Sequence, residues 1–280
     1  MTAAPTGWAA EAAASPGLLA ASAEVAADAM PDDATHDRFC GDWWLHQRRR
    51  GHRTSADDLL TAWLAASMVE GRRVERYADL GCGIGSVLLM TTHAVCPGAA
   101  LGVEAQRQSV RMAHQSVVEL PAGAPPVALL WGDLRAVDPE RFGQFDLVTG
   151  SPPYLPVGTG VPSPDPQREA CRFELRGGVE DYCLAAARLL APDGCLALVF
   201  QSRWTERVRR AIGAAGLEWT DQVDVAMRRD DETPFLSVYG AAHPGARRPA
   251  AAVVRRWVRE PDGSESADYR AMRASLGLVR

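Results

Sequence analysis

The chain has 280 residues, of which 47% are hydrophobic, and a formal net charge of -5. This length suffices for one large α/β domain, and no stretch reaches the roughly 18 uninterrupted apolar residues of a membrane-spanning helix. All 30 basic residues are arginine, which excludes P-loop, Schiff-base and lysine-base chemistry. The cysteines form no Cys-x-x-Cys pair and no histidine stands near them at metal-ligand spacing, so the sequence predicts no metal site.

The beginning of the chain differs in composition from the remainder. Residues 1–38 are rich in Ala, Pro, Gly and Asp without apolar periodicity, which favours a flexible tail. We expect a single domain over 39–280, with a cap segment at 39–72 and a Rossmann-like core at 73–280. The first 30 residues lack the positive charge of a targeting segment, so we expect a cytoplasmic protein that does not bind membranes.

Helices and strands are predicted to alternate after the cap segment. A helix is expected from Ser55, because Thr54-x-x-Asp57 and Ser55-x-x-Asp58 are both acidic forms of a capping box. Further helices are expected near 86–94, 109–119, 178–190 and 206–214. Strands are expected near 74–80, 100–103, 127–131, 145–149, 195–200, 222–226, 235–241 and 251–259. Such alternation is typical of a doubly wound, mostly parallel sheet with helices on both faces.

A glycine-rich loop joins the first core strand to the following helix. Gly81, Gly83 and Gly85 alternate with other residues, and glycine allows a backbone to approach a ligand where a Cβ would block it. A dinucleotide-binding fingerprint would require a third glycine at position 86, where the chain has Ser86. The spacing therefore favours an adenosyl cofactor of the S-adenosylmethionine type over a nicotinamide dinucleotide.

Acidic residues at the ends of three predicted strands complete this pattern. Glu104 follows Gly85 by 19 residues, at the strand end where a carboxylate binds the two ribose hydroxyls. Asp79 ends the strand before the loop, and we expect it to bind the amino-acid part of the cofactor directly or through water. Asp133 ends the third strand and is expected to accept a hydrogen bond from the adenine amino group.

The fourth strand ends in Ser151-Pro152-Pro153-Tyr154, a motif that fits methyl transfer to a planar nitrogen. The lone pair of such an amine is delocalised into its ring, so the enzyme must accept hydrogen bonds from the NH2 group. We expect Ser151 and the carbonyl of Pro152 to be these acceptors, with both prolines fixing the backbone. Tyr154 would offer a face on which a flipped base stacks.

These motifs resemble those of bacterial tRNA-Val adenine N6-methyltransferases, relatives of the small-domain RNA methyltransferases. The resemblance runs from about Gln47 to the C-terminus, and the Pro-Gln-Arg-Glu segment is its most family-specific match. The matching segments are Gln47-Arg-Arg-Arg-Gly-His-Arg-Thr-Ser-Ala-Asp-Asp-Leu-Leu60, Asp79-Leu-Gly-Cys-Gly-Ile-Gly85, Val103-Glu104, Gly132-Asp133 and Pro166-Gln-Arg-Glu-Ala-Cys-Arg172.

The resemblance implies a class I methyltransferase with a seven-stranded sheet, S-adenosylmethionine as cofactor and tRNA as substrate. It also implies that Asp57 caps the cofactor site. The residues that we expect to contact the substrate are Arg48, Arg49, Arg50, Arg53, Gln167, Arg168 and Arg172.

One departure leaves the target open. The family has Asn at the first motif position, whereas this chain has Ser151, whose side chain is shorter but still accepts one hydrogen bond. Serine at this place also occurs in cytosine N4-methyltransferases acting on DNA, so cytosine N4 methylation is an alternative. Three classes of function remain: a methyltransferase of an RNA base, one acting on a protein glutamine amide or a small metabolite, and a non-catalytic protein that binds the cofactor or RNA.

Overall fold

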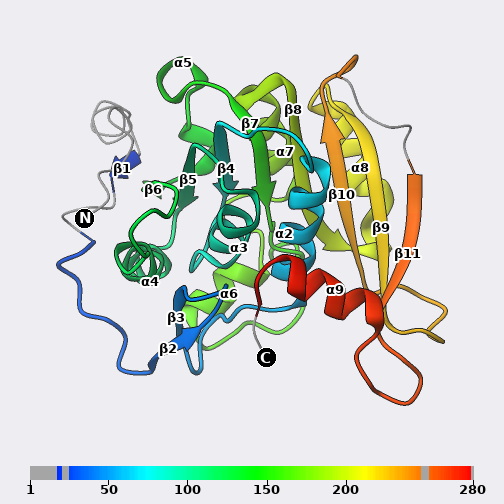
Figure 1. Ribbon diagram of the computed structural model, residues 1–280, viewed down its shortest axis with the longest axis horizontal. Coiled ribbons are helices and arrows are strands. Elements are labelled where there is room, and N and C mark those ends of the chain that lie inside the picture. Colours follow the sequence, from blue (N-terminus) through cyan, green and yellow to red (C-terminus); the bar gives the residue numbers. More distant parts are fainter. Residues whose placement is uncertain (1–17, 21–24, 247–251, 279–280) are drawn as a thin grey trace.

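The computed structural model describes residues 18–20, 25–246 and 252–278, and its centre is a twisted sheet with helices on both faces (Figure 1). The strands of this sheet are β1 (Leu18–Ala20), β4 (Arg76–Leu80), β5 (Ala99–Glu104), β6 (Val127–Gly132), β7 (Phe145–Gly150), β8 (Leu190–Gln201), β9 (Glu218–Arg228), β10 (Leu236–Ala242) and β11 (Ala252–Arg259). Their spatial order is β1-β6-β5-β4-β7-β8-β10-β9-β11. The doubly wound α/β fold expected from the sequence is therefore confirmed.

The sheet has nine strands, whereas the sequence pattern predicts eight and the family resemblance implies seven. The inner seven, β6 to β9, form a parallel set from β6 to β8, followed by β10, which is antiparallel to both neighbours. Two edge strands extend this set. β1 pairs antiparallel with β6, and β11 pairs parallel with β9. The strand order reverses between the parallel neighbours β4 and β7. Such a switch point leaves a crevice at the carboxyl ends of these strands.

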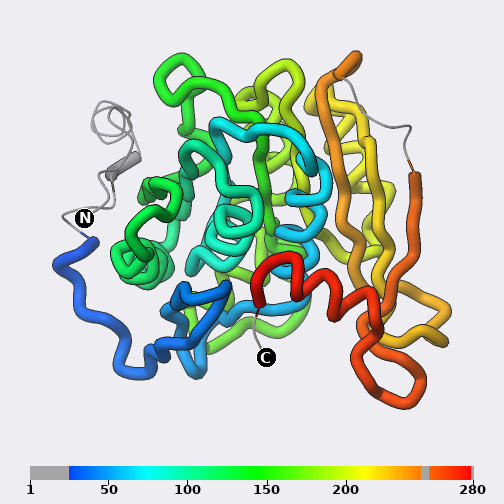
Figure 2. Tube along the Cα trace, viewed as in Figure 1, coloured from blue at the N-terminus to red at the C-terminus, as the bar shows by residue number. Residues whose placement is uncertain are grey.

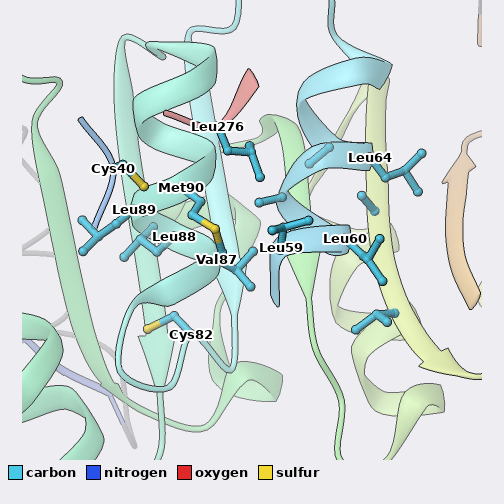
Figure 3. Close-up of a cluster of buried hydrophobic side chains, with 14 of the residues drawn as sticks. Cys40, Leu59, Leu60, Leu64, Cys82, Val87, Leu88, Leu89, Met90 and Leu276 are labelled. Carbon is cyan, nitrogen blue, oxygen red and sulfur yellow. The ribbon is translucent and has the colours of Figure 1, made fainter. Parts of the chain in front are cut away.

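Helices cover both faces of the sheet because its central strands are apolar on both sides. In β8, Cys195, Ala197 and Val199 face one hydrophobic cluster, and the alternate residues from Leu196 to Phe200 face the other. The first cluster contains α2 (Ala56–Met68) and α3 (Ser86–Val95), which lie side by side in Figure 3. The second contains α7 (Val179–Leu189) and α8 (Thr205–Ala214).

Four more α-helices occur among the described residues. These are α4 (Arg107–Val118), the short α5 (Pro139–Phe142), α6 (Pro166–Arg172) and α9 (Ala267–Ser275). The first of them, α4, packs against β5 and β6. The helix α9, which the sequence did not predict, packs against α2 and β11. Among the described residues, no helix combines the length and apolar character needed to cross a bilayer.

The described structure begins before the expected boundary at residue 39. β2 (Ala34–Arg38) and β3 (Trp44–Arg48) form an antiparallel hairpin, so the last five residues of the expected tail are a strand. Figure 2 shows this blue segment beside the red C-terminal segment, and the amide of Gly41 donates to the carbonyl of Gly277 at 2.7 Å. Residues 1–17 and 21–24 of the expected tail lie outside the described residues.

Candidate cofactor and substrate site

A pocket opens at the carboxyl ends of β4, β5, β6 and β7, where parallel α/β sheets bind ligands. Most of the residues that the sequence assigned to the cofactor and to catalysis line it. The exception is Gly85, which lies outside the lining. The predicted residues in the lining are Asp57, Asp79, Gly81, Gly83, Glu104, Asp133, Ser151, Pro152, Pro153 and Tyr154.

The three glycines of the loop are required for different reasons. Gly83 has a φ of +55°, and a Cβ built there meets no atom within 4 Å, so this backbone faces open space in the pocket. A Cβ on Gly81 would overlap the hydroxyl of Tyr182. Gly85 caps α3 in the left-handed region, with a φ of +88°. Only Gly83 therefore fits the expected role of close backbone approach to a ligand, while the other two serve packing and helix initiation.

Two buried oxygen atoms of the pocket have no hydrogen-bond partner among the described residues. Asp79 accepts a hydrogen bond from Thr149 at 2.7 Å through one carboxylate oxygen, but Oδ2 is unpaired. The second unpaired atom is Oγ of Ser151. Buried polar atoms without a partner cost about 1–3 kcal/mol each. Because both residues line the pocket, the unpaired oxygens indicate a ligand with hydrogen-bond donors.

The carboxylates of Glu104 and Asp133 are held by neighbouring groups. Glu104 accepts from the amide of Gly83 at 3.0 Å and from the amide of Gln106 at 2.6 Å. It thereby fixes the glycine loop, and burial raises its pKa above the ordinary value. Asp133 accepts from the side chain of Arg135 at 2.6 Å, so an adenine amino group would share this carboxylate with a guanidinium.

The start of α2 forms another wall of the pocket. Ser55 is the N-cap residue, and Asp58 completes the capping box by accepting from the Ser55 amide at 3.3 Å. Asp58 also accepts from the hydroxyl of Ser86 at 2.8 Å. Asp57 accepts from the hydroxyl of Tyr154 at 2.9 Å. The Tyr154 ring packs edge-on against Phe200, with 5.1 Å between centroids. The Asp57–Tyr154 hydrogen bond thus connects the start of α2 to the Ser-Pro-Pro-Tyr motif.

The pocket is strongly acidic. Its lining contains the five carboxylates of Asp57, Asp58, Asp79, Glu104 and Asp133, but only one arginine, Arg176, and one histidine, His52. Burial raises the pKa of Asp79 to about 7, and burial with the repulsion of Asp57 raises that of Asp58. Clustered carboxylates that cannot all ionise easily are relieved by a bound cation. The arrangement therefore suits a positively charged ligand.

The arginines expected to contact a substrate lie outside the pocket lining. Arg48 forms ion pairs with Asp33 at 2.8 Å and with Asp165 at 2.6 Å, and its side chain is only 17% exposed. Arg53 pairs with Asp37 at 3.1 Å. These two arginines connect the hairpin to its surroundings. Arg49 and Arg50 are exposed and form no side-chain ion pair with the described residues.

The Pro-Gln-Arg-Glu segment forms the first turn of α6. Gln167 is 2% exposed; its side chain donates to Ser109 of α4 at 3.0 Å and accepts from the His52 amide at 3.2 Å. Gln167 therefore links the cap segment, α4 and α6, and the structure corrects its expected substrate contact to a structural one. Arg168 and Arg172 are exposed on the same helix.

Among the lining residues that the sequence did not identify as site residues are His52, Asp58 and Arg176. Asp58 was recognisable only as part of a capping box. Burial lowers the pKa of His52, but contact with Cys171 and the charges of Asp57 and Glu104 outweigh this, so its pKa is raised overall. Nothing in the local sequence distinguishes His52 or Arg176 from other polar loop residues.

Comparison with known proteins agrees with this geometry. No protein-family model matches the chain. A 4-amino-L-phenylalanine/4-methylamino-L-phenylalanine methyltransferase of Streptomyces pristinaespiralis is 30% identical over 143 residues, which cover 49% of this chain and 47% of that protein. A tRNA1(Val) (adenine(37)-N6)-methyltransferase of an Enterobacter species is 31% identical over 142 residues, covering 50% of this chain and 55% of that protein. The chain resembles the class I S-adenosylmethionine-dependent methyltransferases.

The fold is shared with a solved structure. The crystal structure of a predicted O-methyltransferase from Agrobacterium tumefaciens superimposes with a TM-score of 0.56 at 20% identity, covering 78% of this chain and 97% of that one. At this identity the likeness concerns the fold alone. The matches to the Streptomyces and Enterobacter methyltransferases span only about half the length of each protein.

Proposed function

We propose that this methyltransferase-like chain transfers a methyl group from S-adenosylmethionine to an amino nitrogen conjugated to an aromatic ring. The nucleobase that we favour is adenine, methylated at N6 in tRNA. The observation that carries the proposal is the unpaired Oγ of Ser151, buried in the same acidic pocket as the unpaired Oδ2 of Asp79. Oγ of Ser151 suits a target amine, and Oδ2 of Asp79 suits a cationic cofactor.

The pocket fits S-adenosylmethionine. This molecule carries a sulfonium and an ammonium against one carboxylate, so its net positive charge complements the acidic lining. Oδ2 of Asp79 would accept from the ammonium group, and Glu104 would bind the ribose hydroxyls. The open space at Gly83 would accommodate the part of the cofactor that joins its ammonium end to its ribose. When bound, the cofactor supplies an electrophilic methyl group.

The residues of the motif would prepare the nucleophile. Ser151 Oγ and the Pro152 carbonyl accept hydrogen bonds from the target NH2, which withdraws its lone pair from the ring and orients it. Alignment contributes more here than base strength, because the weakly basic amine can release its proton to water after the methyl group is added. No lysine or histidine base is needed at the motif.

A free aromatic amine of a small metabolite is a second candidate substrate. The Streptomyces relative is named for an aminophenylalanine, whose amine is conjugated to a benzene ring. The ion pairs of Arg48 and Arg53 also neutralise two of the arginines whose charge would attract RNA phosphates. Serine in place of asparagine reduces the hydrogen bonds available to a nucleobase edge, which is compatible with the simpler amine.

Mass spectrometry of tRNA nucleosides from a strain lacking the protein tests the favoured candidate. The methylated adenosine should disappear and should return when the wild-type chain is supplied, but not when the Ser151→Ala chain is supplied. An unchanged nucleoside profile would contradict tRNA as the substrate. Methylation of 4-aminophenylalanine by the purified chain would then support the metabolite candidate.

The raised pKa of Asp79 predicts opposite pH dependences for stability and for cofactor affinity. A carboxyl whose pKa rises on folding holds its proton more tightly in the folded state. The ligand-free protein should therefore lose stability as pH rises from roughly 4 to about 7. Binding of a cation requires the carboxylate, so affinity for S-adenosylmethionine should increase as pH rises through 7. Thermal unfolding with and without cofactor at pH 5.5 and 8 measures the stability and the cofactor affinity. An affinity independent of pH would contradict the role of Asp79 in binding the cofactor.

Glu104→Ala should weaken cofactor binding by about 1–3 kcal/mol, because two ribose hydroxyls lose their acceptors. Loss of the hydrogen bond from the Gly83 amide to Glu104 is a second reason to expect weaker binding, because this bond fixes the glycine loop. Glu104→Gln is the matched control, because it keeps one acceptor for the loop. Calorimetric titration should place its affinity between those of the wild type and Glu104→Ala. An unchanged dissociation constant in Glu104→Ala would assign the ribose to another residue.

RNA binding should depend on Arg49 and Arg50 more than on Arg48. The double change Arg49→Gln, Arg50→Gln should reduce the slope of log K against log salt by about 0.7–0.9 for each phosphate that the protein no longer neutralises. Arg210→Gln, an exposed change on α8, serves as control. An unaltered slope in the double variant would show that Arg49 and Arg50 face solvent and do not contact RNA phosphates.

A further inference from the structure

A second cluster of chemically active side chains lies on the N-terminal hairpin, apart from the pocket lining. His36 of β2 and His46 of β3 are direct partners in the antiparallel register. Their rings stack with 4.6 Å between centroids and an angle of 17°. Both imidazoles reach Glu119, which caps the C-terminus of α4. The Nε2 atoms of His36 and His46 lie 2.9 Å and 3.0 Å from its carboxylate oxygens.

We propose that His36, His46 and Glu119 form a binding site for Zn²⁺ or a similar borderline divalent cation, which fastens the hairpin to α4. One ligand atom from each residue lies within 4.8 Å of the other two. Two ligands on a tetrahedral zinc ion stand about 3.3 Å apart at bond lengths of about 2.0–2.2 Å. Small side-chain rotations therefore suffice to close the three groups around an ion. A fourth position would remain for water.

The groups around the cluster hold it in place. Gln115 donates to the Glu119 carboxylate at 2.8 Å, and its own oxygen accepts from Arg111 at 3.0 Å. Trp44 also stacks on His36, with 4.4 Å between centroids. Hydrogen bonds from second-layer residues orient ligands and increase metal affinity. Such support distinguishes the cluster from histidines and carboxylates that meet by chance on a surface.

The chemistry of the donors selects the kind of ion. Two imidazoles and one carboxylate suit Zn²⁺, Cu²⁺ or Ni²⁺, whereas Mg²⁺ and Ca²⁺ prefer oxygen ligands. Without metal, each Nε2–H donates to Glu119; with metal, Nε2 of each neutral ring must bind the ion instead. The hairpin's backbone is already tied to α4, because the amide of His46 donates to Ser116 at 2.9 Å. The ion would add a side-chain connection between the same two elements.

This site was not recognisable in the sequence. His36 and His46 are separated by the hairpin turn, and Glu119 follows His46 by 73 residues. No spacing typical of a zinc motif relates them. Only the β2–β3 register and the packing of α4 against the hairpin bring the three side chains together (Figure 1).

Calorimetric titration of the full chain, purified without a histidine tag, with Zn²⁺ tests the proposal. One ion should bind per chain, and Mg²⁺ should give no heat. His36→Gln and Glu119→Gln should each weaken zinc binding at least tenfold. The His36 side chain is 48% exposed, so its replacement should leave the circular dichroism spectrum unchanged. Co²⁺ should give the intense visible absorption of a four-coordinate complex.

Two controls make the outcome decisive. His243→Gln changes a histidine outside the cluster and should leave zinc affinity unchanged. Cys96→Ala removes an exposed thiol that could bind zinc by itself, and should also leave it unchanged. Absence of zinc binding, wild-type affinity in His36→Gln, or an equal loss in His243→Gln or Cys96→Ala would each overturn the proposal.

Discussion

Replacing Gly83 with valine is expected to abolish binding of S-adenosylmethionine. The backbone at Gly83 faces open space in the pocket, and the amide is held by Glu104 at 3.0 Å. A valine side chain would project into this space and exclude the cofactor. The φ of +55° adds strain of roughly 1–2 kcal/mol for a residue with a Cβ. Calorimetric titration of the cofactor measures the effect.

A matched control separates strain from obstruction. Gly216 has a φ of +76°, and a Cβ built there also meets no atom within 4 Å, but this residue does not line the pocket. Gly216→Val should lower the melting temperature about as much as Gly83→Val and should keep wild-type cofactor affinity. If Gly83→Val also kept that affinity, the glycine loop would not be the cofactor site.

Ser151→Ala is expected to reduce kcat roughly ten- to a thousandfold, equivalent to about 1.4–4 kcal/mol of activation free energy. The Ser151 hydroxyl is buried and has no partner among the described residues, so it is available to a substrate amine. Its loss would leave the lone pair of the amine delocalised into the ring. Affinity for the cofactor should change little, because Asp79 and Glu104 provide the expected contacts. Steady-state kinetics and calorimetry on the same preparation test the two statements.

A second substitution at the same position distinguishes the candidate substrates. Ser151→Asn should keep or raise activity on adenine if the pocket has the geometry of the tRNA-methylating relatives. The longer side chain should obstruct the pocket if it is shaped for another amine, and activity should fall. Ser67→Ala, an exposed change on α2, controls for nonspecific effects of serine removal. Wild-type turnover in Ser151→Ala would contradict the role of the hydroxyl.

The core and most of the pocket were predictable from the sequence because their signals are local. The glycine loop, Glu104 and the Ser-Pro-Pro-Tyr motif each stand at or directly after the end of a strand, and parallel strands bring their carboxyl ends to one edge. The structure places all of them around one pocket, with Gly85 set back at the start of α3. The alternation of helices and strands was sufficient to predict this edge.

Features that depend on distant partners were not predictable. Arg48 resembles a solvent-exposed member of an arginine run, but Asp33 and Asp165 neutralise it, the latter 117 residues away. Gln167 resembled a substrate-binding residue of a known motif, yet both ends of its amide are occupied within the protein. The edge strand β1, which the sequence did not predict, likewise depends on pairing with β6.

Transfer of a deuterated methyl group tests the central proposal most directly. The purified chain would be incubated with S-adenosylmethionine carrying a trideuterated methyl group, together with unmodified tRNA or with 4-aminophenylalanine. Products would be identified by mass spectrometry. We expect the label on an amino nitrogen of one of these substrates, at a rate strongly reduced by Ser151→Ala. Absence of labelled product with both substrates, or label on oxygen or carbon, would contradict a methyltransferase of ring-conjugated amines.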